Sequence, residues 1–323
     1  MSKSNSTLSA LSLYEKGLYN LKLLRMQMAR RQNVGFDWVA ENYREYDGFL
    51  RQFSGRSLLH SRALEIGFGA RPFRLFYLIN MGVDAYGVDL DAPLVKMSLS
   101  DMCSIAKKNG IERAAKSIAR WMVVQRKEYG LFAEFCSRPD GKPVGFDSIV
   151  RKSEGRMIVS DGGDERFWRR FARPFDLILS EDVFEHIPEP VLDKVLELMP
   201  HYLSNDGIAI IRPNIFTGIT GGHRLEWYRH TLLNPDPSRY RRSPPWDHLR
   251  EDKFPADTYL NRLTRADFRT KFTRNFDILE ERTMLPDLGR EYLTEGVRQQ
   301  LVNYSDEELF SNNVLFVLRK RAQ

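Results

Sequence analysis

The chain has 323 residues, of which 42% are hydrophobic and 12% aromatic, enough to build the core of one large domain or two ordinary ones. This composition excludes a disordered, collagen-like or coiled-coil protein. The net charge is +6 and is unevenly distributed. Residues 1–62 and residues 224–274 each carry a net charge of +5, and the rest of the chain carries −4. Such segments suit an acidic or phosphorylated ligand, and they equally suit a solvated surface.

Signals for export and membrane insertion are missing from the sequence. Its two cysteines, Cys103 and Cys136, are too few for a disulfide framework or a cysteine metal site. The N-terminal residues lack the apolar core of a signal peptide, and no run of 18 apolar residues occurs. We therefore expect a cytoplasmic protein without a membrane span.

The first sixty residues predict a helical extension that precedes a domain over residues 61–323. Apolar residues recur at steps of three and four from Leu11 to Met28, which indicates an amphipathic helix. The aromatic residues from Trp38 to Phe53 predict a second helix that packs on another element. The amphipathic helix would either close over a site or join two subunits, so an oligomer is left open.

From residue 63 onwards, short apolar runs alternate with turns and helical stretches, which predicts βα units around a mostly parallel sheet. Two intervals are too long for plain connections: about 92–156, with a helical middle near 111–135, and about 216–272. We interpret both as insertions and the second as a substrate lid. The seven predicted strands are Ala63–Ile66, Ala85–Val88, Met157–Val159, Phe175–Leu179, Gly207–Ile211, Phe276–Leu279 and Val314–Leu318.

A glycine turn follows the first predicted strand. Gly67 and Gly69 flank Phe68, and glycine lets the backbone turn tightly and approach a ligand closely. Glu65, two residues before the turn, would repel a pyrophosphate but not an ammonium group. Pro72 stands where a dinucleotide-binding fingerprint has its third glycine. A cationic ligand therefore fits this turn better than a dinucleotide.

The next three strands also end in acidic or small residues. The second strand ends in Asp89, placed to accept hydrogen bonds from two ribose hydroxyls, and Leu90 follows it. The third ends in Asp161-Gly162, where a carboxylate suits an adenine amine, and the fourth ends in Ser180-Glu181. Open α/β sheets bind ligands at the carboxyl ends of their strands, so we expect these residues to share a crevice.

Together these motifs resemble the class I S-adenosylmethionine-dependent methyltransferases, whose first motif is an acid, any residue, Gly, any residue, Gly. The resemblance covers roughly residues 60–100, 156–215 and 273–320. It implies an enzyme with S-adenosylmethionine as cofactor and an α/β fold: a Rossmann-like, seven-stranded, mostly parallel sheet with helices on both faces and a closing antiparallel hairpin. It places Glu181 and His186 in the segment that borders the methyl-transfer site. The implied cofactor-binding residues are Glu65, Gly67, Phe68, Gly69, Asp89, Leu90, Asp161, Gly162, Ser180 and Glu181.

The predicted lid holds three of the six histidines, His223, His230 and His248, and Glu226 lies between the first two. An imidazole that titrates near neutrality can take the proton of a hydroxyl as it is methylated, so we predict that one of these histidines is the base and count Glu226 among the catalytic candidates. The lid aromatics would stack on the apolar face of a sugar or ring, and three arginines would hold a phosphate or carboxylate. The alternative is that the histidines and tryptophans pack the lid against the sheet. The residues concerned are Trp227, Trp246, Arg239, Arg241 and Arg242.

The acceptor class follows from what the segment after the fourth strand lacks. It has neither the Asp/Asn-Pro-Pro-Tyr turn that holds planar amines nor a cysteine nucleophile, and Glu181 and Glu185 are too close together for arginine methylation. We therefore favour O-methylation of a sugar, glycan or small molecule over N-methylation of such an acceptor. The Trp-Asp-His-Leu run at 246–249 and residues 292–309 are diffusely similar to methyltransferases of bacterial polysaccharide pathways. The alternatives are an RNA methyltransferase that uses the basic segments, which is not favoured, and a non-catalytic adenosyl-binding scaffold.

No metal site is predicted from the sequence. Asp182 and Asn214 follow the fourth and fifth strands and would offer two oxygen ligands. Two oxygens are too few for a hard octahedral ion such as Mg²⁺.

Overall fold

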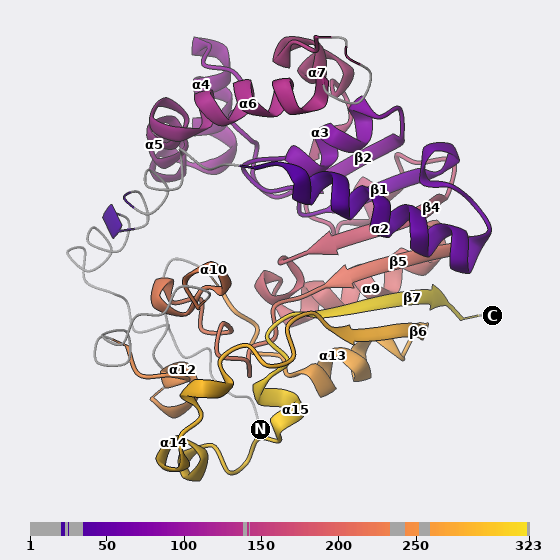
Figure 1. Ribbon diagram of the computed structural model, residues 1–323. Coiled ribbons are helices and arrows are strands. Elements are labelled where there is room, and N and C mark those ends of the chain that lie inside the picture. Colours follow the sequence, from indigo (N-terminus) through magenta and orange to yellow (C-terminus); the bar gives the residue numbers. More distant parts are fainter. Residues whose placement is uncertain are drawn as a thin grey trace.

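The computed structural model is built around one seven-stranded sheet, which runs through the middle of the molecule (Figure 1). It describes residues 35–137, 141, 143–232, 243–251 and 259–321, together with residues 21, 22 and 25. None of the helices in these ranges combines the length and the apolar character that crossing a membrane requires.

The strand order across the sheet is β3-β2-β1-β4-β5-β7-β6. The first five strands pair in parallel, and β7 lies antiparallel between β5 and β6. All seven predicted strands are confirmed, and so is the fold class, including the closing antiparallel hairpin. The strands are β1 Arg62–Ile66, β2 Asp84–Asp89, β3 Met157–Val159, β4 Phe175–Glu181, β5 Leu203–Arg212, β6 Phe276–Thr283 and β7 Val314–Lys320.

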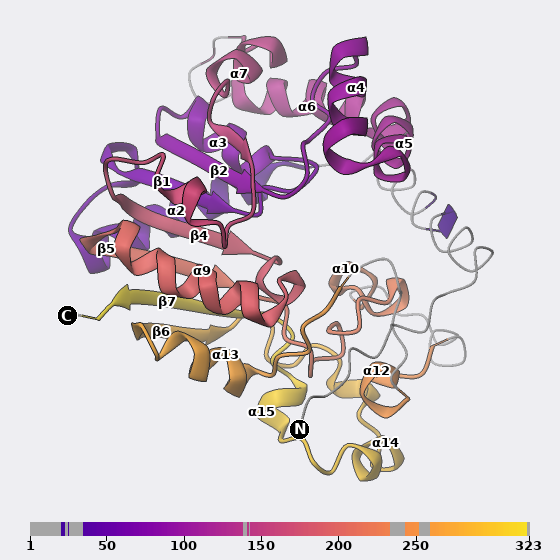
Figure 2. The same ribbon diagram turned by 180° about the vertical axis from the view of Figure 1, so that it is seen from behind.

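Helices cover both faces of the sheet. One face carries α2 (Asp37–Ser54) and α3 (Phe73–Asn80), and the other carries α8 (Glu165–Trp168), α9 (Glu189–Tyr202) and α13 (Arg265–Phe272) (Figures 1 and 2). Side chains along a strand alternate between these faces, so β4 buries Leu177 and Leu179 on the α2 side and Ile178 on the α9 side. Continuous apolar runs are therefore needed in the central strands.

The aromatic-rich segment before the sheet forms α2, as predicted. Tyr46 and Leu50 are fully buried against the sheet, and the helix ends at Gly55, whose positive φ of 65° is easy only for glycine. The amphipathic helix predicted from Leu11 to Met28 lies outside the described residues, apart from helical positions 21, 22 and 25.

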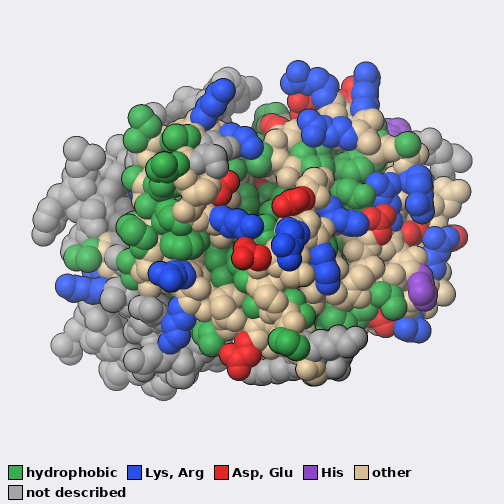
Figure 3. Space-filling view, turned by 90° about the horizontal axis from the view of Figure 1, so that it is seen from above, with side chains coloured by type: hydrophobic (Ala, Val, Ile, Leu, Met, Phe, Trp, Pro, Cys, Tyr) green, Lys and Arg blue, Asp and Glu red, His purple; other side chains and the backbone are tan. Residues whose placement is uncertain are grey.

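The segment between β2 and β3 forms a helical layer on the α3 side of the sheet. It packs on α3 through aromatic contacts, in which Phe73 and Phe76 meet Phe132. The predicted helical middle is confirmed. Figure 3 views the molecule from above, where hydrophobic side chains gather beside charged ones. Within the helical layer, Leu99 and Ile111 are exposed. Its elements are α4 Leu99–Asn109, α5 Ile111–Arg120, the π-helical turn η2 Trp121–Gln125, α6 Arg126–Ser137 and α7 Phe146–Lys152.

The segment between β5 and α13 packs against the β6–β7 connection and forms a small core apart from the sheet. Trp227 and Trp246 are fully buried there, with Val297, Leu301 and Phe310 from the connection. Because α13 packs on the sheet, the inserted part is shorter than the predicted 216–272. The elements are η4 Leu225–Trp227, α10 Arg229–Leu232 and α12 Asp247–Arg250 in the lid, and η5 Arg290–Tyr292, α14 Glu295–Gln300 and α15 Asp306–Leu309 in the connection.

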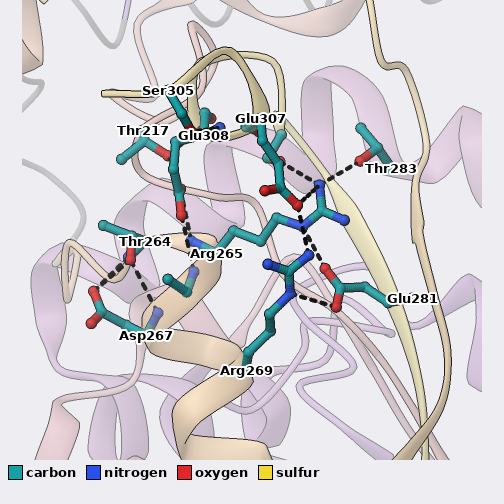
Figure 4. Close-up of polar contacts among 12 residues, drawn as sticks. Thr217, Thr264, Arg265, Asp267, Arg269, Glu281, Thr283, Ser305, Glu307 and Glu308 are labelled. Carbon is teal, nitrogen blue, oxygen red and sulfur yellow. Dashed lines mark hydrogen bonds and ion pairs between the residues drawn. The ribbon is translucent and has the colours of Figure 1, made fainter. Parts of the chain in front are cut away.

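Ion pairs join this connection to α13 and β6 (Figure 4). Arg265 and Arg269 of α13 both pair with Glu281 of β6 and with Glu307 of α15. The carboxylate of Glu308 accepts the first two backbone N–H groups of α13, each at 3.0 Å, where the helix dipole favours a negative charge. The β6–β7 connection is therefore anchored to α13 and β6 of the sheet domain.

Candidate active site

The glycine turn after β1 has the backbone that the sequence predicts. Gly67 and Gly69 have positive φ angles of 83° and 69°, and the N–H of Gly67 donates to the Val88 carbonyl at 2.7 Å. A Cβ atom on Gly67 would lie 2.3 Å from the side chain of Val183, which follows β4. Position 67 thus requires glycine for its φ angle and for the close approach of the β4 loop.

Asp89 at the end of β2 is joined directly to this turn. One carboxylate oxygen accepts the N–H of Gly69 at 2.8 Å, and the other accepts the N–H of Asp91 at 2.9 Å. Burial raises the pKa of this carboxyl, and the two backbone donors partly offset the rise. Each oxygen keeps a further lone pair, so the carboxylate can still accept the two hydroxyls of a ribose. Leu90 beside it is 65% exposed, whereas Phe68 is buried under the turn.

The loop after β3 is tied to the core. The exposed side chain of Asp161 accepts the N–H of Gly163 at 2.7 Å, and the carbonyl of Gly162 accepts the indole N–H of the buried Trp168 at 2.7 Å. Since β3, β2, β1 and β4 are neighbours, the predicted cofactor-binding residues share one edge of the sheet. Ser180 contributes to that edge by donating to the Ile66 carbonyl at 2.8 Å, which joins β4 to β1.

The other two predicted cofactor acids have partners within the protein. Glu65 and Glu181 are both buried, and each accepts a hydrogen bond of 2.7 Å from the guanidinium of Arg74 in α3. Glu181 also accepts from Tyr46 of α2 and pairs with Arg212 of β5. Sequence reasoning missed Arg74. The sequence did offer one indication of its role: Arg74 lies in the first turn of a helix, where the helix dipole disfavours a positive charge.

The charges of this network shift the pKa values of the two carboxyls in opposite directions. Burial alone would raise the pKa of Glu181, but Arg74 and Arg212 outweigh burial and lower it. For Glu65, burial outweighs Arg74 and raises the pKa. Glu181 therefore acts as an ionised anchor that holds α2 and α3 to the carboxyl edge of the sheet.

A second group of polar side chains lies beyond the ends of β4 and β5. It contains Asp182, Glu185 and His186, and His223 from the lid joins it with its ring centre 4.9 Å from that of His186. Asp182 and His223 have positive φ angles of 55° and 52°, a strained backbone for residues with a Cβ, and such strain concentrates at functional sites. Asn214 lies 3.4 Å from Nε2 of His223.

These groups have strongly altered proton affinities. The carboxyl of Glu185 is 3% exposed, and its pKa is well above the usual range because of burial and the nearby Asp182. The backbone amides of Glu185 and Asn214 face it without completing a hydrogen bond. Solvent reaches Asp182, yet the surrounding protein atoms and Glu181 raise its pKa to about 6. Burial lowers the pKa of His223 to about 3.

The other lid candidates lie in different environments. His248 in α12 is buried, and its Nε2 donates to the Phe216 carbonyl at 2.8 Å. Glu226 lies partly exposed in η4, and His230 lies in α10, with its side chain outside the described residues. Residues 239, 241 and 242, the lid arginines, are also outside the described residues.

For the two lid tryptophans, the prediction that the lid aromatics stack on a sugar or ring was wrong. Trp227 is 1% exposed and Trp246 is fully buried, because both fill the core between the lid and the β6–β7 connection. Instead, both tryptophans pack the lid against the β6–β7 connection.

His248 predicts a loss of stability in acid. Burial lowers its pKa from 6.5 to about 4, so below pH 6.5 the unfolded chain binds a proton that the folded chain excludes. The stabilisation is complete above pH 6.5 and is lost as the pH falls towards 4. Between pH 7 and 4.5 the wild type should lose about 2–3 kcal/mol more unfolding free energy than His248→Gln. Urea titrations at both pH values measure this, and the exposed His201→Gln is the control. Equal losses in all three proteins would contradict the assignment.

A cavity of about 720 Å³ lies at the other edge of the sheet. It is lined by Leu203, the first residue of β5, and by Phe171, His201, Tyr202 and Lys320 among others. Open α/β sheets bind their ligands at the carboxyl edge, so the cavity is separate from the site described above.

Comparison with known proteins finds similarity only at the level of solved structures. No protein-family model matches the sequence, and no curated protein matches it. Among similar structures is an S-adenosylmethionine-dependent methyltransferase from Clostridium acetobutylicum, 13% identical over 94% of this chain and 98% of that chain, with a TM-score of 0.41. Another is the CcbJ methyltransferase from Streptomyces caelestis, 12% identical over 87% and 90%, with a TM-score of 0.41. The N-methyltransferase NodS from Bradyrhizobium japonicum, in complex with S-adenosyl-L-homocysteine, is 12% identical over 94% and 100%, with a TM-score of 0.36. At these values the comparison carries no argument about function, which rests on the site itself.

Proposed function

We propose that the protein is a methyltransferase that uses S-adenosylmethionine and methylates a hydroxyl of a sugar, glycan or small molecule. The observation that carries this proposal is the hydrogen bond between Asp89 and the N–H of Gly69, which joins the carboxylate of β2 to the glycine turn of β1. It holds a carboxylate that can accept both hydroxyls of a ribose beside two glycines, which have no side chain to keep a ligand away, the arrangement that an adenosine ligand requires. The cofactor, when bound, supplies a methyl group on a positively charged sulfur.

The chain's own contribution to this reaction is positioning. The adjacent carboxyl ends of β1, β2 and β3 would hold the nucleoside through Asp89 and Asp161, which leaves the ends of β4 and β5 for the acceptor. The rate of an in-line displacement rises most when the protein holds the two reactants close together and aligned, and no nucleophile of the enzyme is needed.

A base for the hydroxyl proton is available at the end of β4. Asp182 is reached by solvent, and its pKa of about 6 leaves it mostly ionised at pH 7 yet able to accept a proton. Of the predicted lid histidines whose side chains the structure describes, His223 is the one in this group, but its pKa of about 3 makes it a weak base. We therefore place Asp182 ahead of His223 in this role.

Titration calorimetry of the full chain with S-adenosylmethionine and S-adenosyl-L-homocysteine tests the proposal. Saturable binding of both, followed by transfer of a labelled methyl group to nucleotide sugars or glycans, is the expected result. Methyl transfer to RNA alone would contradict the sugar, glycan or small-molecule acceptor and support an RNA methyltransferase. Cofactor binding without transfer to any acceptor would favour a non-catalytic scaffold. No binding of either ligand would overturn the cofactor and the activity together.

A further inference from the structure

We propose that Glu185, His186 and His223 form a binding site for one divalent transition-metal ion, with Zn²⁺ as the best fit. Each residue offers one ligand atom, and these atoms lie within 4.8 Å of one another. Two imidazoles and one carboxylate are a usual set for Zn²⁺ and Fe²⁺, whereas Mg²⁺ prefers oxygen ligands. The three residues come from the turn after β4 and from the lid, so the fold brings the set together.

The ligand spacing is close to what an ion needs. The Oε1 atom of Glu185 lies 3.8 Å from Nε2 of His186. Ligand atoms about 2.1 Å from a tetrahedral Zn²⁺ are roughly 3.4 Å apart, so this pair would move by less than half an ångström. Both residues belong to the 3-10 turn η3 (Phe184–His186), which starts three residues after β4 and fixes their relative positions.

The carboxylate of Glu185 lacks the partners that its burial requires. It is 3% exposed, and within the described ranges neither of its oxygens completes a hydrogen bond. Leaving a buried polar group without a partner costs free energy, and a carboxylate costs most. The groups that face it are the backbone amides of Glu185 and Asn214, the two histidines and Asp182, and none of these carries a fixed positive charge. A bound cation would supply the missing partner.

His186 is oriented as a metal ligand. Its Nδ1 lies 2.9 Å from the backbone carbonyl of Tyr259. Because a carbonyl only accepts, Nδ1 carries the proton, and the lone pair on Nε2 faces Glu185. A hydrogen bond from the second ring nitrogen to a carbonyl is the usual support of a metal-binding histidine.

His223 is directed into the group by a strained turn. A Cβ on Gly221 would lie 2.2 Å from the Phe216 carbonyl, and a Cβ on Gly222 would lie 2.6 Å from the ring of His248. Two glycines are therefore required immediately before His223, whose own φ is 52°. The strained backbone persists only where the surrounding structure enforces it, and its effect is to bring this ring beside His186.

The ion would leave positions open for further ligands. Three protein ligands with a free position are typical of catalytic zinc sites, where water or a substrate oxygen completes the shell. Asp182, which solvent reaches, lies close enough to act on Glu185 and would face such a water. That the open position holds the acceptor hydroxyl rests on the proposed function, whereas metal binding itself does not.

The test uses the full chain freed of metal by a chelator. Calorimetry with Zn²⁺ should show one ion per chain, and Co²⁺ should give a visible absorption spectrum with nitrogen ligands. His223→Ala and Glu185→Gln should each weaken Zn²⁺ binding by at least tenfold and change the Co²⁺ spectrum. His201→Ala, an exposed histidine of α9, is the control and should bind as the wild type does.

Several outcomes would overturn the proposal. These are the absence of saturable Zn²⁺ binding to the wild type, a stoichiometry unrelated to one ion per chain, or unchanged affinity in both variants. Circular dichroism checks that the variants fold, and His223→Asn, which keeps a polar side chain, is a second variant at the same position. Cofactor binding is measured separately. Metal binding without cofactor binding would support the metal site and overturn the proposed function. Cofactor binding without metal binding would overturn the metal site and support the proposed function.

Discussion

Replacing Arg74 with methionine should lower the free energy of unfolding by roughly 3–5 kcal/mol. The guanidinium of Arg74 is the shared partner of Glu65 and Glu181, whose side chains are 2% and 7% exposed. Removing one partner of a buried ion pair leaves the other charge without compensation, and here two carboxylates lose the same cation. Arg212 still reaches Glu181, which limits the loss at that carboxylate.

Urea unfolding at pH 7 measures this effect. The control is Arg51→Met, which removes an exposed pair with Asp47 within α2 and should leave the free energy of unfolding nearly unchanged, because water screens an exposed ion pair. Adding Glu65→Gln and Glu181→Gln to the Arg74 variant should recover part of the loss, because the buried negative charges are then gone. A loss below about 1 kcal/mol for Arg74→Met would show that the network contributes little.

Replacing Asp89 with alanine should weaken the binding of S-adenosylmethionine by at least roughly 100-fold. Hydrogen bonds to a charged group contribute about 1.5–3 kcal/mol each, and the proposed function gives this carboxylate two ribose hydroxyls. The substitution also releases the N–H of Gly69, so the glycine turn loses its fixed geometry. Both effects act in the same direction.

Calorimetry on the variant and two controls separates these contributions. Asp84→Ala changes an acid at the opposite end of β2, where it pairs with Arg156, and should leave cofactor affinity unchanged. Asp89→Asn keeps one acceptor oxygen and should fall between the wild type and the alanine variant. If Asp89→Ala binds the cofactor as the wild type does, the ribose assignment is wrong.

Local sequence patterns were sufficient for the architecture. Apolar runs bounded by turn residues located all seven strands. Central strands that are buried on both faces need near-continuous apolar runs, and the edge strands β3 and β6 carry shorter ones. That Asp89 and the glycine turn lie at the same end of the sheet also followed from their order along the chain, since consecutive parallel strands bring their carboxyl ends together. The glycine turn could be predicted because glycine, which has no Cβ, adopts a positive φ angle without a steric cost.

The sequence by itself therefore determined the fold class and the edge of the sheet that carries the site. Only the tertiary structure decided what each polar side chain meets there. Arg74 pairs with Glu181 across 107 positions of the chain, and His223 reaches His186 through a lid that follows β5. Burial and long-range electrostatics depend on which elements pack together, and no local pattern encodes that. For the same reason the lid tryptophans, which suggested a sugar platform, turned out to be core residues.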